Sequence, residues 1–213
     1  MPILTGSGST SAREKLLDTA SALFYRRGIV ATGVDTVVEA SGVSKPTLYA
    51  HFRSKSELIA AVLDRRHTRR VVALPAWLGE AADDPLERLL ALFDWLAEIY
   101  ARDAPRGCAF LNAAAETPDA DQPAWEVISR HKRWMTDFLT ELATNAGLTN
   151  PAQLGSQLLL LIDGASSRVL VEAGAHPPAD RITEIVAHAK QAAKVLITHA
   201  GRLEPTGPLD HES

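Results

Sequence analysis

The stretch SGVSKPTLYAHFRSKSEL, at residues 41–58, constrains the fold of this 213-residue chain more than any other part of it. It combines helix-breaking, helix-capping and aromatic residues, which rules out a long helix, and it lacks the alternation of a strand. Gly42 suits a sharp turn with a positive φ angle, because glycine has no β-carbon. Ser44 can cap a following helix, and Pro46 is tolerated in a first helical turn. The stretch therefore predicts a short helix that begins at a fixed residue.

We expect this short helix at residues 45–52, with one apolar side and one polar side. Leu48 and Phe52 are four residues apart and face inward. Because two helical turns are not stable alone, the preceding helices must hold this one in place. The polar side carries Lys45, Thr47, Tyr49 and His51. Cations and hydroxyls suit phosphate, and an aromatic ring suits a sugar or a thymine methyl group. The pattern is typical of a helix-turn-helix recognition helix that enters the major groove.

The rest of the chain after residue 10 has apolar residues at helical spacing, and it shows neither strand alternation nor an internal repeat. Ser11 with Glu14, and Ser54 with Glu57, have the spacing of a capping box at the start of a helix. Pro85 and Pro151 stand where two later helices would begin. These features predict an all-α fold.

The charge is divided unevenly along the chain. The net charge is −4, yet residues 1–74 carry eleven Lys and Arg against six Asp and Glu, and the remainder carries eleven against twenty. A basic N-terminal third on an acidic body indicates that only this third meets a polyanion.

Other classes of protein are not favoured by the composition. A single cysteine, Cys108, excludes an intramolecular disulfide framework, and we expect no metal site and no cofactor. The apolar run at residues 158–162 is shorter than a membrane span, and residues 1–10 do not resemble a signal peptide. We therefore expect a cytoplasmic protein that does not enter a membrane.

The run ATGVDTVVEASGVSKPTLYAHFRSKSEL, preceded by AREKLLDTASALFYRRG, resembles the N-terminal domain of TetR-family transcriptional regulators. The resemblance covers residues 11–70 as an ordered string of features. It implies a small domain that binds double-stranded operator DNA, and a helical C-terminal domain that binds an inducer and forms a homodimer through its last two long helices. It also implies that Lys55 contacts phosphate. The predicted DNA-binding residues are Ser44, Lys45, Pro46, Thr47, Tyr49, His51 and Lys55.

The resemblance also implies a division of the chain. A helix-turn-helix domain would span residues 11–56, and a larger ligand-binding and dimerisation domain would span residues 57–200. Residues 1–10 and 201–213 are expected to be disordered, because they lack apolar periodicity.

Apolar faces in the larger domain suggest two further sites. The candidates for the wall of a ligand pocket are Trp95, Trp125, His131, Trp134, Met135 and Phe138, and for each of them a place in the plain core is the alternative. The candidates for a dimer interface are Leu158, Ile162, Ile182, Ile185, Ala189, Ala193 and Leu196.

The sequence leaves two rival classes, an all-α enzyme and a helical small-molecule-binding protein without DNA binding. It contains no nucleophile elbow, HExxH spacing, P-loop or dinucleotide-binding glycine motif, so we expect no enzyme. The charge division and the cap-turn-cap pattern argue against the second class. The favoured interpretation is a ligand-responsive repressor that a small molecule of unknown identity releases from a palindromic operator.

Overall fold

The computed structural model describes residues 11–101, 106–117, 123–174 and 179–201, and within these ranges the regular structure is helical. The chain divides into two compact units. The first contains Met1–Val72 and Cys108–His131, and the second contains Ala73–Gly107 and Lys132–Ser213. The expectations for residues 1–10 and for the tail after Gly201 fall outside the described residues. The predicted all-α fold is confirmed, whereas the functional boundary at residue 56 stays a prediction.

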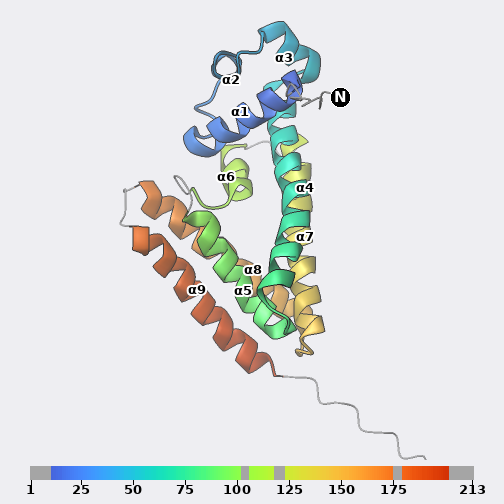
Figure 1. Cartoon of the computed structure of the whole chain (residues 1–213), viewed down its shortest axis with the longest axis vertical. Helices are drawn as coiled ribbons and strands as arrows, with labels where there is room; N and C mark the ends of the chain where they lie inside the picture. The colour runs from blue at the N-terminus through green and yellow to red at the C-terminus, as the bar shows by residue number, and fades with distance from the viewer. Residues whose placement is uncertain (1–10, 102–105, 118–122, 175–178, 202–213) are drawn as a thin grey trace, which may run out of the picture. The chain divides into compact units, whose positions relative to one another are not determined.

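The first unit is built around α1 (Ala12–Arg27), α2 (Val34–Ser41) and α3 (Lys45–His51). It also takes in the first part of α4 (Lys55–Ala81), all of α6 (Ala109–Glu116) and the first part of α7 (Pro123–Asn145). Figure 1 shows α1, α2 and α3 as consecutive short helices. The core of the unit includes the buried side chains of Leu16, Leu17, Leu48, Leu58 and Phe110.

The helix ends in the first unit follow local sequence signals. Ser11 Oγ accepts the N–H of Glu14 at 3.2 Å, and Gly28 ends α1 with a φ angle of 92°. At the start of α4, Ser54 Oγ accepts the N–H of Glu57 at 3.1 Å. The Glu57 carboxylate accepts the N–H of Arg53 at 2.9 Å, one residue before the N–H that a capping box predicts. Caps therefore fix these helices close to the predicted residues.

The second unit contains α5 (Pro85–Tyr100), α8 (Pro151–Gly174), α9 (Ala179–Ala200) and the remaining parts of α4 and α7. Within it, α9 packs along both α5 and α8 (Figure 1). Asp84 caps the start of α5, and its Oδ1 accepts the N–H groups of Leu86 at 2.8 Å and Glu87 at 3.1 Å. By length and composition alone α8 could cross a membrane, but Leu158, Ile162 and Val169 bury one of its sides in the core of this unit.

Candidate nucleic-acid interface

The turn between α2 and α3 sets the start of the short helix. Gly42 has a φ angle of 66°, in the left-handed region that a β-carbon disfavours. Its N–H donates to the carbonyl of Val38 at 3.1 Å, and the Val43 side chain is buried beneath the turn. Ser44 Oγ then accepts the N–H of Thr47 at 3.3 Å. The predicted turn and N-cap are confirmed.

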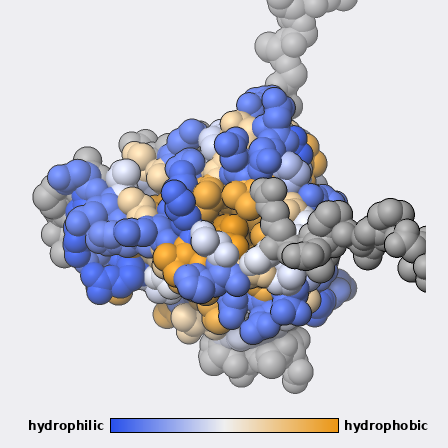
Figure 2. Space-filling view, turned by 90° about the horizontal axis from the view of Figure 1, so that it is seen from below, coloured by the Kyte–Doolittle hydropathy of each residue, from blue (hydrophilic) through white to orange (hydrophobic). Residues whose placement is uncertain are grey.

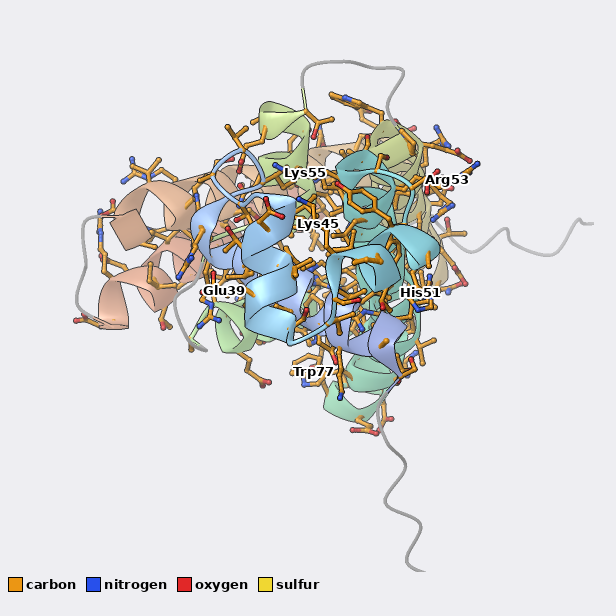
Figure 3. All side chains as sticks on the ribbon, turned by 90° about the horizontal axis from the view of Figure 1, so that it is seen from above. Glu39, Lys45, His51, Arg53, Lys55 and Trp77 are labelled. Carbon is orange, nitrogen blue, oxygen red and sulfur yellow. The ribbon has the colours of Figure 1, made fainter. Side chains whose placement is uncertain are left out.

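The two sides of α3 differ as the spacing predicts. Leu48 and Phe52 are buried in the core of the first unit. Lys45, Pro46, Tyr49 and His51 are exposed, and Thr47 is half-buried. The Thr47 hydroxyl lies 2.8 Å from Ser44 Oγ, so both hydroxyls remain at the helix start. Figure 3 looks onto this end of the first unit and labels Lys45 and His51. The exposed positions of α3 therefore carry a cation and two rings, and hydroxyls lie at the start of the helix.

Lys45 makes an ion pair in the free protein. Its Nζ lies 2.7 Å from Asp35 Oδ1, and the hydrogen bond and charge of Asp35 raise the pKa of Lys45 above 10.5. Lys45 is therefore a cation at neutral pH. Both side chains are well exposed, so solvent weakens the pair. Asp35 lies in the first turn of α2, and Gly33, which precedes that helix, supplies no side-chain cap.

Lys55 has a different environment from Lys45. Its Nζ donates to the carbonyl of Ile29 at 2.6 Å, and its side chain is half-buried. Burial lowers the pKa of Lys55 below 10.5, and the nearby Glu116 carboxylate opposes that change. Lys55 already bonds within the first unit, so its contact with phosphate stays a prediction. Glu116 is distant in sequence, and nothing in the motif pointed to it.

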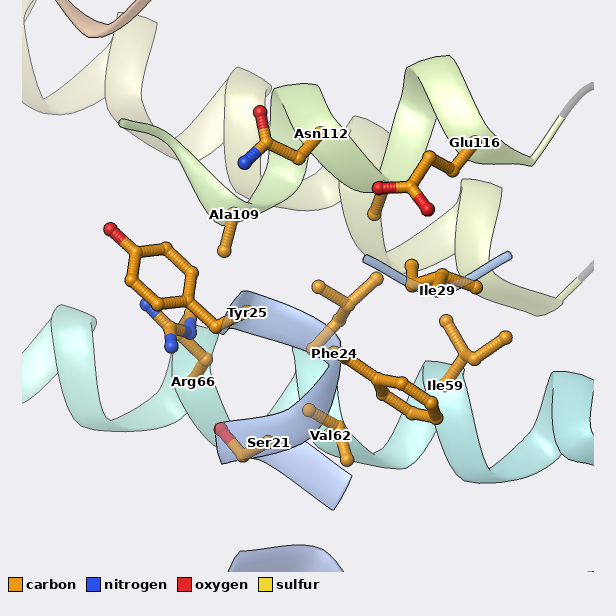
Figure 4. Close-up of a pocket in the computed structure, with 12 residues that line it drawn as sticks. Ser21, Phe24, Tyr25, Ile29, Ile59, Val62, Arg66, Ala109, Asn112 and Glu116 are labelled. Carbon is orange, nitrogen blue, oxygen red and sulfur yellow. The ribbon is translucent and has the colours of Figure 1, made fainter. Parts of the chain in front are cut away.

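A small cavity lies in the first unit between α1, α4 and α6 (Figure 4). Its volume is about 20 Å³, and apolar side chains such as Phe24, Ile59 and Val62 line it. The Arg66 guanidinium lies 4.9 Å from the centre of the Tyr25 ring at one end of the cavity. This volume is that of a water molecule, far below the roughly 300 Å³ of a small drug-sized site.

The six predicted ligand-wall residues fall in both units. Trp95 and Met135 are buried in the core of the second unit, where the rings of Trp134 and Phe138 stack at 5.6 Å. In the first unit, Trp125 Nε1 donates to the carbonyl of Thr117 at 2.7 Å. Their role in binding a ligand stays a prediction.

His131 has the environment of a core histidine. It is buried, and its ring stacks on Phe110 with the centroids 3.6 Å apart. Its Nδ1 lies 3.2 Å from Nδ1 of His67 on α4. The core alternative for this residue therefore has direct geometric support.

Most of the predicted dimer residues are buried inside the second unit itself. Leu158, Ile162, Ile182, Ile185 and Ala193 belong to its core, and Ala189 and Leu196 are half-buried. On the described parts of the same helices, the exposed large apolar residues are Leu160, Val171 and Val195, at 72%, 68% and 53%. Sequence reasoning missed Leu160 because the whole run at residues 158–162 is apolar, so periodicity did not separate its two sides.

Comparison with known proteins agrees with the helical arrangement along most of the chain. A family model described as "Bacterial regulatory proteins, tetR family" matches residues 16–62, and one described as "Tetracyclin repressor-like, C-terminal domain" matches residues 85–185. The HTH-type transcriptional repressor ComR of Escherichia coli (strain K12) is 34% identical over 134 residues, which are 61% of this chain and 64% of the repressor. The match therefore spans slightly less than two thirds of that relative.

Two solved structures are similar over longer stretches. A TetR-family transcriptional regulator from Streptomyces coelicolor has a TM-score of 0.78 and 29% identity, covering 88% of this chain and 96% of its own. A TetR transcriptional regulator from Streptomyces avermitilis has a TM-score of 0.68 and 34% identity, covering 87% of this chain and 99% of its own.

Proposed function

We propose, from the membership of this chain in the tetR family of bacterial regulatory proteins, that it represses transcription as a homodimer bound to a palindromic operator. That family consists of DNA-binding transcriptional regulators, and regulation of DNA binding by a ligand is typical of it. The observation that carries the proposal is the exposed side of α3, which presents Lys45, Tyr49 and His51 while Leu48 and Phe52 anchor the helix. We further propose that the protein acts in the cytoplasm.

In this proposal α3 enters the major groove by its N-terminal end. Lys45 exchanges Asp35 for a phosphate, and the Tyr49 ring meets a sugar or a thymine methyl group. Ser44, Thr47 and His51 lie on the same helix within reach of the backbone or the base edges. Pro46 fixes the first turn of the helix.

Dimerisation is supported by an uncharged stripe on the exposed side of α8. It is defined by Ser156, Leu160, Gly164, Ser167 and Val171, whose spacing of three or four residues places them on one helix face. A β-carbon at Gly164 would meet no atom within 4 Å, so a second helix can approach closely there. Figure 2 shows apolar surface surrounded by polar side chains on the face seen from below. We propose that the α8 stripe packs on a second copy, with Val195 of α9 beside it.

A small-molecule inducer would act by binding more tightly to a dimer whose recognition helices do not fit the operator. For its site we propose the aromatic part of the second unit, where Trp134 stacks on Phe138 and Trp95 and Met135 are buried. A screen can identify such a compound in two steps. The compound should quench the tryptophan fluorescence of the protein, and it should then release the protein from operator DNA.

The double variant Lys45→Ala/Tyr49→Ala tests the central part of the proposal. We expect it to lose operator binding while keeping its circular dichroism and its thermal unfolding, because neither side chain is in the core. Arg69→Ala, which removes an exposed cation of α4, is the matched control and should bind normally. Normal operator binding by the double variant would refute the assignment of α3.

A further inference from the structure

One peptide group between α1 and α2 is held on both sides by charged side chains from distant parts of the first unit. The N–H of Val30 donates to Glu116 Oε2 at 2.8 Å, and the carbonyl of Ile29 accepts from Lys55 Nζ at 2.6 Å. These two groups belong to the same peptide bond. A peptide dipole is positive at its N–H and negative at its oxygen, so each end meets a charge of the favourable sign. We call this arrangement the peptide clamp.

The surroundings of the peptide clamp strengthen it. Both bonds join a charged side chain to the backbone, and charge-assisted hydrogen bonds are stronger than neutral ones; the bond from Lys55 is also partly buried. The backbone also approaches the carboxylate closely, because a β-carbon at Gly28 would lie only 2.9 Å from Glu116 Oε2. The Val30 side chain is 74% exposed and packs little, whereas the Ile29 side chain is buried in the core and the Ile29 carbonyl also accepts the N–H of Thr32 at 3.3 Å.

The position of the clamp connects it to the recognition helix. The clamped peptide lies in the segment between Gly28, which ends α1, and Gly33, which precedes α2. That segment determines how α2 leaves α1, and α2 continues through the Gly42 turn into α3. Glu116 is the last residue of α6, so a displacement of the end of α6 removes the anion from the loop.

We propose that Glu116 and Lys55 are positioning residues for operator binding, acting together through the Ile29 carbonyl and the Val30 N–H. The inference rests on the proposed DNA-binding function and assigns a role to residues outside the recognition helix. Lys55 then serves to orient α2 and α3, and its charge does not neutralise a phosphate. The loop is ordered before DNA arrives, so binding does not have to order it.

Glu116→Ala tests the anionic half of the clamp. We expect the Val30 amide to lose its protection from hydrogen exchange, measured by NMR without DNA. Operator affinity should fall roughly five- to tenfold, at the low end of typical coupling between sites, with an unchanged salt dependence. Glu116→Gln keeps an acceptor oxygen, so its Val30 amide protection and its operator affinity should lie closer to those of the wild type. Glu80→Ala makes the same change in net charge on the exposed side of α4 and should have no effect.

Lys55→Ala separates the clamp from a phosphate contact. If Lys55 belongs to the clamp, Lys55→Ala should lower operator affinity as much as Glu116→Ala does and leave the salt slope unchanged. The double variant should then bind no more weakly than either single variant, because both changes release the same peptide. If Lys55 instead contacts phosphate, Lys55→Ala should reduce the magnitude of the slope of log K against log salt concentration by about 0.9. Its effect on operator affinity should then add to that of Glu116→Ala.

The inference is overturned if the Val30 amide stays protected in Glu116→Ala, if this variant binds the operator like the wild type, or if Lys55→Ala behaves as a phosphate contact. Circular dichroism checks that each variant is folded, and if Glu116→Ala is not, the salt slope of Lys55→Ala still decides between the clamp and a phosphate contact. Failure of the wild-type protein to bind any operator would instead refute the proposed function, whereas the exchange result would still report on the clamp.

Discussion

The exposed side of α3 and the exposed stripe of α8 are both uncovered surfaces of regular helices, yet their compositions are opposite. The side of α3 carries Lys45, Tyr49 and His51, which suit a hydrated polyanion. The α8 stripe carries Leu160 and Val171 separated by small residues, which suits another apolar helix surface.

The difference shows why exposure alone does not identify a functional surface. The polar side chains of α3 are stable in water and do not need a partner to cover them. Their functional significance therefore comes from the caps and the turn that fix the direction of the helix. When another surface covers the apolar side chains of the α8 stripe, the free energy falls by about 25 cal/mol for each Å² of apolar area buried. The first surface therefore suits selective recognition, and the second suits a permanent partner.

The largest effect is expected from a charge in the α8 stripe. The double variant Leu160→Glu/Val171→Glu should be monomeric in sedimentation equilibrium, because the dimer would bury two unpaired carboxylates in each copy. Its operator affinity should fall at least about 100-fold, because linked binding of two half-sites is lost. Ala76→Glu, at an exposed position of α4, is the control and should stay dimeric. A dimer with both charges present would exclude the stripe from the interface.

A smaller effect is expected on the other surface, at Lys45. Lys45→Ala should lower operator affinity by about tenfold and should reduce the magnitude of the salt slope by about 0.9. Asp35→Asn releases Lys45 from its exposed ion pair and should raise affinity by up to about fivefold. Fluorescence anisotropy over a salt series measures both changes. Weaker binding by Asp35→Asn would show that Asp35 does not compete with phosphate.

Substitutions at two glycines test whether the turn before α3 requires the positive φ angle of Gly42. A β-carbon at Gly42 or at Gly79 would meet no atom within 4 Å, but only Gly42 has a positive φ angle. Gly42→Ala should lower the free energy of unfolding by about 1–2 kcal/mol. Gly79→Ala, inside α4, should raise it by about 0.5–1 kcal/mol. Denaturant unfolding measures both, and equal signs for the two variants would contradict this account.

The smallest effect is expected at His67, within the first unit. Burial lowers its pKa below 6.5, the nearby Arg130 adds to this, and Asp64 opposes it. The unfolded chain therefore binds a proton more readily than the folded protein as the pH falls. Stability should be full above pH 6.5 and decrease below it. His67→Gln should flatten this decrease in unfolding experiments between pH 7.5 and 5.5, and identical curves for the variant and the wild type would count against it.

The sequence was sufficient for the helices and for α3, because caps, turns and periodic apolar residues are local signals. Ser44, Gly42 and Leu48 act on neighbours within four residues, and the structure places them as the spacing predicts. The contact of Glu116 with Val30 joins residues 86 positions apart, so no local signal predicts it. The exposed position of Leu160 was also not predictable, because its neighbours in sequence are equally apolar.

The central claim is that a dimer reads a palindrome through α3. Its most direct test is to sequence the duplexes that the wild-type protein retains from a pool of randomised DNA. We predict enrichment of a palindrome whose half-sites lie about 10 base pairs or somewhat more apart. Affinity for that duplex should fall with salt at a log–log slope of about −5 to −9. Retention without enrichment of any sequence would contradict the account.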